Sequence, residues 1–197
     1  MPGQRTTQVS DVRIETYTGP RRELRALFEL AEDSPAELDG YLALGRVLVA
    51  RLDGHVVGHL QVVPTERPGE AELKNMAVLP RLQGRGIGRA LVASLVELLA
   101  AERVTTLLVA TAAAGLDNLR FYQRCGFRMR SIERDAFTEA TGYPPGVVID
   151  GIELRDRVWF DRAIPARRPG PPSPGPDGAQ GGGGQHEERG DGVGADA

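Results

Sequence analysis

The chain has 197 residues, a net charge of −3 at neutral pH and a single cysteine, Cys125. A chain of this length supports one hydrophobic core of ordinary size, and one cysteine excludes an intramolecular disulfide. The weak negative charge, with no basic stripe interleaved with aromatic residues, argues against a nucleic-acid partner. No stretch approaches 18 consecutive apolar residues, and the N-terminal residues show no apolar leader. We therefore expect a soluble cytoplasmic protein that contacts no membrane.

Composition divides the chain into three parts. Residues 1–10 are polar and are expected to form a flexible arm. Nearly all aliphatic and aromatic side chains fall within residues 11–165, which predicts one folded domain there. Residues 166–197 are rich in proline and glycine and cannot bury enough apolar surface to offset the entropy of ordering. A disordered tail is predicted for this last part.

Hydrophobic periodicity predicts the elements of the domain in chain order. Alternating residues at 12–16 predict a first strand, and stripes with helical spacing predict helices at 21–31 and 35–42. The pair Asp53-Gly54, between two β-branched runs, predicts a hairpin. The remaining expected elements are a strand that ends at Pro80, a helix at 87–99, a strand at 105–111, a helix at 117–125, and strands at 127–134 and 155–161.

A glycine-rich turn, Gln83-Gly84-Arg85-Gly86-Ile87-Gly88, joins the strand before Pro80 to the following helix. Helix N-termini carry amides without intrahelical acceptors and a dipole that favours negative charge, so this turn is interpreted as a cradle for a pyrophosphate. A dinucleotide fingerprint does not fit, because Arg89 stands where its third glycine is required. A Walker A loop does not fit either, because the only lysine, Lys74, lies upstream. A plain strand–helix connection is the alternative.

Two segments resemble signature motifs of the GNAT acetyltransferase superfamily. Gln83, Gly86 and Gly88 match the acetyl-CoA-binding motif Gln/Arg-x-x-Gly-x-Gly/Ala. Asn118 and Tyr122, followed by Gly126-Phe127, are similar to the family's second segment. The resemblance covers about residues 11–164. It implies one α/β (α+β) domain with a mixed, mostly antiparallel sheet of six to seven strands flanked by about four helices.

The resemblance also implies an activity and a donor site. It implies an acetyl-CoA-dependent N-acetyltransferase that transfers the acetyl group directly to a primary amine in a ternary complex, without a metal. In the family, backbone amides on the central strand polarise the thioester carbonyl, an oxyanion-hole arrangement. The implied cofactor-binding residues are Met76, Ala77, Val78, Gln83, Gly84, Arg85, Gly86, Ile87, Gly88, Arg89, Asn118 and Tyr122.

The resemblance gives two residues catalytic roles. Tyr122 would protonate the departing thiolate, because a phenol with a pKa near 10 is not ionised at rest; a tyrosine packed in the core is the alternative. Glu72 would be the general base, directly or through a water, and a solvent-facing strand charge is the alternative. Asn118 would contact the pantetheine arm or cap its helix beside Asp117.

Other reactive side chains receive plainer interpretations. His55 and His59 are expected on one face of their strand, without a third ligand for a metal. His59 is a second base candidate or, more simply, a half-buried strand residue. Cys125 is interpreted as a small buried side chain and not as an acyl carrier.

The acceptor side is implied by the resemblance to involve the first two helices and the loop before the last strand. Its polar residues, mostly acidic, would suit a small cationic amine such as a polyamine or an aminoglycoside, or a basic peptide end; ordinary surface charge is the alternative. A CoA-binding sensor without turnover and a protein or peptide N-acetyltransferase are the rival functions, and a homodimer through the last strand is left open. The polar residues of the implied acceptor side are Glu29, Glu32, Asp33, Glu37, Asp39, Asp135, Glu139, Tyr143 and Asp150.

Overall fold

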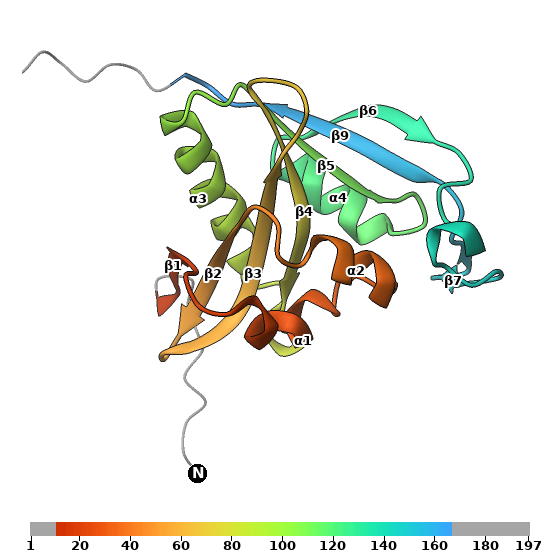
Figure 1. Cartoon of the computed structure of the whole chain (residues 1–197), viewed down its shortest axis with the longest axis horizontal. Helices are drawn as coiled ribbons and strands as arrows, with labels where there is room; N and C mark the ends of the chain where they lie inside the picture. The colour runs from red at the N-terminus through yellow and green to blue at the C-terminus, as the bar shows by residue number, and fades with distance from the viewer. Residues whose placement is uncertain (1–10, 167–197) are drawn as a thin grey trace, which may run out of the picture. The chain divides into compact units, whose positions relative to one another are not determined.

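The computed structural model describes residues 11–166 of the chain. These residues form a seven-stranded sheet in the order β1-β2-β3-β4-β5-β9-β6, with helices on both faces (Figure 1). Every neighbouring pair of strands is antiparallel except β4 and β5, which are parallel. The predicted fold class is confirmed. The expectations for residues 1–10 and for 167–197 lie outside the described residues.

The elements follow the predicted order. The strands of the large sheet are β1 (Arg13–Thr16), β2 (Arg46–Leu52), β3 (His55–Pro64), β4 (Glu70–Val78), β5 (Thr106–Ala112), β6 (Arg128–Glu133) and β9 (Arg157–Ala163). The α-helices are α1 (Arg25–Phe28), α2 (Pro35–Tyr41), α3 (Ile87–Ala101) and α4 (Leu116–Arg124). Short 3₁₀ turns span Arg21–Leu24, Pro80–Leu82 and Glu139–Thr141, and a small hairpin consists of β7 (Val148–Ile149) and β8 (Ile152–Glu153).

Two parts of the prediction differ from the structure. The helix expected at 21–31 is a 3₁₀ turn followed by a single α-helical turn, and no side chain caps the start of either. The hairpin β7–β8 was not predicted, although its turn is an Asp-Gly pair, Asp150-Gly151, with positive φ at both residues. The flanking strands have only two residues each, too few to show an alternating pattern.

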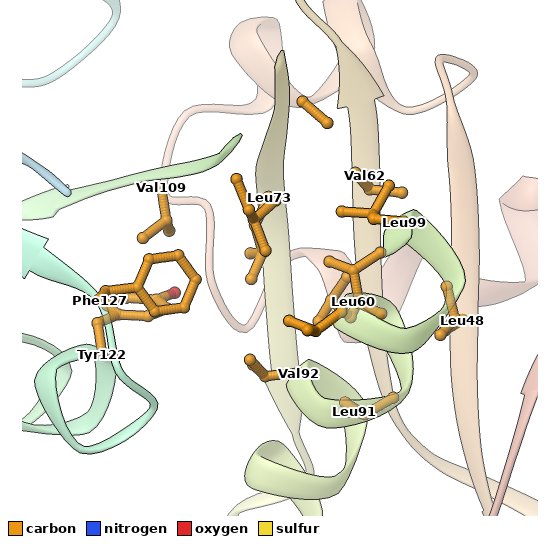
Figure 2. Packing of buried hydrophobic residues seen from close by; sticks show 14 of the residues in the cluster. Leu48, Leu60, Val62, Leu73, Leu91, Val92, Leu99, Val109, Tyr122 and Phe127 are labelled. Atoms are coloured by element: carbon orange, nitrogen blue, oxygen red, sulfur yellow. The ribbon is translucent and has the colours of Figure 1, made fainter. Parts of the chain in front are cut away.

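Two hydrophobic clusters hold the layers together. On one face, α3 packs through Leu91, Leu95 and Leu99, all fully buried, and α4 adds Tyr122 (Figure 2). On the other face, α1 and α2 cover β2 and β3 with a smaller cluster that includes Phe28. Burying a side chain of leucine size stabilises the fold by about 1.5–3 kcal/mol, so the long helix α3 anchors the sheet. None of the helices within residues 11–166 is long and apolar enough to cross a membrane.

The parallel strands β4 and β5 pair along only part of their length. Residues 70–73 of β4 lie opposite residues 106–109 of β5, and beyond this point β5 continues in register with β9 alone. At the same place β4 contains a bulge, because Gln61 and Val62 of β3 face Asn75 and Leu73, which leaves Lys74 as an extra residue. Within the described residues, the second half of β4 therefore has a backbone edge with no strand on its β5 side, next to the point where the strands separate (Figure 1).

Candidate functional site

The three glycines of the turn before α3 each meet a geometric requirement. Gly84 and Gly86 have φ values of +73° and +83°, in the left-handed region that costs other residues about 1 kcal/mol. Gly88 has ordinary backbone angles, but a Cβ there would lie 3.2 Å from the ring of Phe121 on α4. The first two glycines thus shape the turn, and the third lets α3 and α4 approach each other.

Positive charge collects at this turn without being neutralised. Among residues 11–166, Arg81, Arg85 and Arg89 take part in no ion pair. The Gln83 side chain donates a hydrogen bond to the carbonyl of Val78 at 3.1 Å, which ties the turn to the end of β4. With the amides at the start of the 15-residue helix α3, these guanidinium groups make a site suited to an anion.

Helix α4 brings Asn118 and Tyr122 to the same side of the sheet as α3. The helix begins one residue earlier than predicted, at Leu116, with Gly115 in the cap position. The proposed capping role of Asp117 is therefore wrong, and this residue lies in the first turn, 3.6 Å from Arg120. Asn118 is exposed and lines a cavity at the separation of β4 and β5.

Tyr122 is buried among aromatic rings. Its ring centroid lies 5.6 Å from that of Phe127 and 6.1 Å from that of Phe160 (Figure 2). Burial raises the pKa of the Tyr122 phenol well above its ordinary value of 10, so the hydroxyl is protonated at neutral pH. The structure shows a packed phenol that keeps its proton, and the predicted acid role stays a prediction.

A cavity of about 300 Å³ lies at the opening between β4 and β5. Its walls come from the α1–α2 connection, β4, the C-terminal end of β5, Asn118, the loop after β6, and β9. Of the residues singled out in the sequence, five line it: Glu32, Asp33, Glu72, Asn118 and Tyr143. The structure thus brings residues of the proposed donor and acceptor sides into one space.

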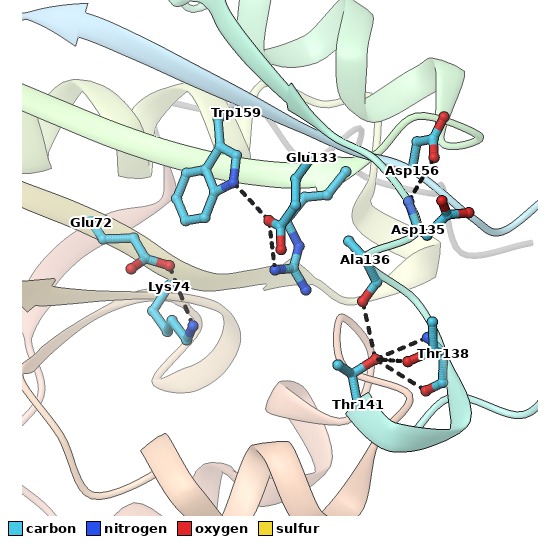
Figure 3. A network of polar contacts seen from close by, with 10 residues as sticks. Glu72, Lys74, Glu133, Asp135, Ala136, Thr138, Thr141, Asp156 and Trp159 are labelled. Carbon is cyan, nitrogen blue, oxygen red and sulfur yellow. Dashed lines mark hydrogen bonds and ion pairs between the residues drawn. The ribbon is translucent and has the colours of Figure 1, made fainter.

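Glu72 and Lys74 of β4 face this cavity together (Figure 3). The Lys74 Nζ lies 3.4 Å from the Glu72 Oε1 and 5.3 Å from the centroid of the Tyr41 ring. A second cavity of about 390 Å³, lined also by Glu37 and Tyr41, opens on the same two side chains. Glu72 is consequently neither a free surface charge nor a buried one, but half of an ion pair at the junction of two cavities.

Glu32 is held by three neutral donors. Its Oε1 accepts hydrogen bonds from the Tyr143 hydroxyl at 2.8 Å and from the Ser34 amide at 3.0 Å. Its Oε2 accepts one from the Tyr41 hydroxyl at 3.2 Å. Burial raises the pKa of both tyrosines, so both keep the protons that they donate. Because no donor carries a charge, the carboxylate is fixed in position while its negative charge is not cancelled.

The bonds continue from Glu32 into the core through Asn75. The Asn75 Nδ2 donates to the Tyr41 hydroxyl at 2.8 Å, and its Oδ1 lies 2.8 Å from the His59 Nε2. Sequence reasoning missed Tyr41 and Asn75. No local signal marks them, because the bonded residues are 34 and 16 positions apart in the chain.

The prediction that His55 and His59 share one face is wrong. Ala50 and Arg51 of β2 face Gly58 and Val56, so Val57 is an extra residue in β3 and the alternation of side chains is reversed between the two histidines. His59 is fully buried against the Phe28 ring, with 4.0 Å between centroids, whereas His55 is exposed. Burial lowers the pKa of His59 to about 4, and it is not among the residues that line either cavity.

The remaining acidic candidates divide by their partners. Glu29 and Asp39 pair with Arg25 at 2.8 and 2.6 Å, so they belong to an exposed ion-pair cluster. Asp135 pairs with Arg155 at 2.6 Å, and Glu139 and Asp150 are exposed loop residues. Glu32 and Asp33, like Glu37, Glu139 and Asp150, take part in no ion pair within residues 11–166, but of these five only Glu32 and Asp33 line the cavity of about 300 Å³.

The loop after β6 is fixed as a wall of the cavity (Figure 3). The Thr141 hydroxyl donates to the Ala136 carbonyl at 3.0 Å and accepts from the Thr138 amide at 2.9 Å. The Asp135 amide donates to Asp156 at 2.9 Å, which ties the start of the loop to the residue before β9. These bonds hold in place the segment that supplies Tyr143.

Comparisons with known proteins agree with this arrangement. A family model described as "Acetyltransferase (GNAT) family" matches residues 10–127. YvbK of Bacillus subtilis, described as an uncharacterized N-acetyltransferase, is 32% identical over 147 residues, which cover 75% of this chain and 93% of YvbK.

Two solved structures are similar as well. A Bacillus subtilis acetyltransferase in complex with CoA is 31% identical with a TM-score of 0.71, over 78% of this chain and 99% of the other. A GNAT family acetyltransferase of Elizabethkingia anophelis with acetyl-CoA bound is 25% identical with a TM-score of 0.72, over the same shares.

Proposed function

The chain belongs to the GNAT acetyltransferase family and is an N-acetyltransferase, and from this premise we propose that it transfers the acetyl group of acetyl-CoA to a primary amine of a small cationic molecule. One observation carries the choice of acceptor. Two carboxylates without ionic partners among residues 11–166, Glu32 and Asp33, line the cavity that opens at the separation of β4 and β5. A cation entering this cavity would find negative charge that no side chain of the described residues cancels.

The proposed donor site runs from the glycine turn to the same opening. Amides of residues 83–88, with Arg85 and Arg89, would hold the diphosphate of CoA. The Asn118 side chain would contact the pantetheine arm. Backbone amides of residues 76–78, on the stretch of β4 that β5 leaves unpaired, would stabilise the oxyanion of the tetrahedral intermediate. The CoA and acetyl-CoA complexes of the two similar structures support this donor.

The chemistry proceeds by direct attack. Glu72, through a water or directly, takes a proton from the acceptor ammonium, since an amine with a pKa near 10 is charged at neutral pH. The neutral amine attacks the thioester carbon, and the carbon–sulfur bond breaks. The pKa of a phenol is above that of a thiol, and burial raises the pKa of Tyr122 further, so its hydroxyl stabilises the departing sulfur by donating a hydrogen bond rather than by losing its proton first.

The charges of the cavity favour an acceptor with a second positive group. Glu72 is matched by Lys74, and Arg157 lies 3.2 Å from Glu133. Glu32 and Asp33 have no ionic partner in the part of the chain that the structure describes, and Tyr41 and Tyr143 orient the Glu32 carboxylate. A charge-assisted hydrogen bond to such a carboxylate is worth about 1.5–3 kcal/mol, enough to select among amines.

A thiol-release assay with acetyl-CoA and a panel of amines tests the proposal. The panel contains polyamines, aminoglycosides, amino acids, basic N-terminal peptides, and a neutral primary amine of matched size as the control. We expect the highest kcat/KM for small amines with a second positive charge. Higher kcat/KM for the neutral amine or for peptides would overturn the acceptor class, and acetyl-CoA binding without turnover on any amine would favour a sensor.

A further inference from the structure

The only lysine of the chain lies in the candidate acceptor cavity. Every other long basic side chain is arginine, yet Lys74 is the extra residue of the β4 bulge and faces the same cavity as Glu72. The two side chains are not interchangeable, because the arginine guanidinium stays protonated in proteins whereas a lysine amine can lose a proton and act as a nucleophile. Lysine at this position therefore carries a chemistry that no other basic residue of the chain has.

The surroundings of Lys74 resemble those proposed for an acceptor amine. Its Nζ lies 3.4 Å from the Glu72 Oε1, the proposed base, and over the Tyr41 ring. Its side chain is 33% exposed, so the amine is reachable from the cavity. Lys74 is the first residue of the stretch of β4 that β5 leaves unpaired, two positions before the amides of residues 76–78 proposed to polarise the thioester, and Asn118 lines the same cavity of about 300 Å³.

We propose that Lys74 is an internal acetyl acceptor, so that the enzyme acetylates its own Nζ when acetyl-CoA is bound and no external amine fills the cavity. The proposal rests on the donor site described above. It adds to the proposed function a modification site within the acceptor cavity.

The step balances without a further reactant. The Lys74 ammonium gives one proton to Glu72, which passes it to solvent. The Nζ lone pair forms a bond to the thioester carbon, the carbon–sulfur bond breaks, and the second proton moves from nitrogen to the departing sulfur. The products are Nε-acetyl-lysine at position 74, the free thiol of CoA and one released proton. The new amide has no charge, so Glu72 loses its ionic partner.

The test uses the full chain, confirmed by intact mass to be unacetylated and incubated with acetyl-CoA in the absence of amines. We expect the mass of one acetyl group to be gained, and peptide mapping to place it on Lys74. The rate constant should not depend on protein concentration, because the reaction is intramolecular, and excess CoA should suppress it. Glu72→Gln should slow the modification by about 100-fold. The matched control is Glu70→Gln, on the same strand and paired with Arg130, which should leave the rate unchanged.

The alternative outcomes distinguish a failure of the self-acetylation proposal from a failure of the proposed acetyltransferase function. If acetyl-CoA binds and amines are acetylated while Lys74 stays unmodified, self-acetylation is refuted and the proposed function stands. A modification that excess CoA and Glu72→Gln leave unchanged is uncatalysed and also refutes it. If acetyl-CoA does not bind at all, the donor site and the inference fail together. Lys74→Arg should abolish lysine acetylation with the affinity for acetyl-CoA kept within about twofold, and a lost affinity would contradict the placement of Lys74 on the acceptor side.

Discussion

The proposed donor and acceptor sites are built in different ways. The proposed donor site consists mainly of backbone from neighbouring residues: a glycine turn, the first turn of α3 and the unpaired stretch of β4. The proposed acceptor site consists of side chains from distant positions, since the bond between Tyr143 and Glu32 joins residues 111 positions apart. Backbone amides can bind an acetyl donor that a whole family shares. The choice of acceptor amine depends on side chains, which single substitutions can change.

A substitution at Tyr122, the proposed proton donor on α4, should show the largest effect. Tyr122→Phe keeps the ring in its aromatic cluster and removes the hydroxyl, so the fold and the affinity for acetyl-CoA should be unchanged while kcat falls by about 100-fold or more. Steady-state kinetics and calorimetry measure the two quantities. Tyr17→Phe, which removes an exposed hydroxyl bonded to Glu23, is the control. An unchanged kcat would show that Tyr122 has no catalytic role and only packs in the core.

The burial of His59 should make the stability of the fold depend on pH. The folded pKa of His59 is about 4, against about 6.5 when unfolded, so below pH 6.5 the unfolded chain binds a proton that the folded chain does not. The free energy of unfolding should therefore be fully present above pH 6.5. It should fall by about 3 kcal/mol between pH 6.5 and 4, from this group alone.

Denaturant titrations at several pH values measure this dependence against His59→Gln, a variant with no titrating group at position 59. The difference in slope between the two proteins isolates the histidine from the carboxylates that titrate nearby. Parallel pH profiles would show that His59 is charged in the folded state or accessible to water.

On the donor side, Gly88→Val should disturb the contact between α3 and α4. The added side chain would meet the Phe121 ring, and overpacking of this kind costs about 1–3 kcal/mol of stability. We also expect at least a tenfold weaker affinity for acetyl-CoA, about 1.4 kcal/mol, because the turn shifts with the helix. Gly40→Ala, where a Cβ meets open space, is the control. An unchanged affinity for acetyl-CoA would contradict the proposal that the glycine turn binds acetyl-CoA.

On the acceptor side, Glu32→Gln should have the smallest effect. The amide oxygen still accepts from the Tyr143 hydroxyl, and the amide NH2 can donate to the Tyr41 hydroxyl oxygen, but the charge is removed. KM for a cationic amine should therefore rise about tenfold while kcat and the affinity for acetyl-CoA change little. Glu29→Gln, already paired with Arg25, is the control. KM for a matched neutral amine should be the same for Glu32→Gln and the parent. An equal rise in KM for both amines would show that Glu32 does not recognise the positive charge.

The sequence predicted features that depend on neighbouring residues and missed those that depend on tertiary packing. Apolar periodicity and the Asp53-Gly54 turn predicted nearly all elements, and the glycines predicted the turn before α3, because these signals are local. The bulges at Val57 and Lys74 leave no local signal, and the first of them separated His55 from His59. The bonds that join Glu32 to Tyr41 and Tyr143 follow from tertiary packing alone. The sequence therefore supplied the acidic candidates, but it did not show which of them line the cavity without a basic partner.

The most direct test of the central claim is a calorimetric titration that compares acetyl-CoA with S-acetylpantetheine, which has the same thioester arm but no diphosphate. If the turn at residues 83–88 holds the diphosphate, acetyl-CoA should bind at least about 100-fold more tightly, a difference of about 2.7 kcal/mol. Equal affinities, or no binding of acetyl-CoA, would contradict the account.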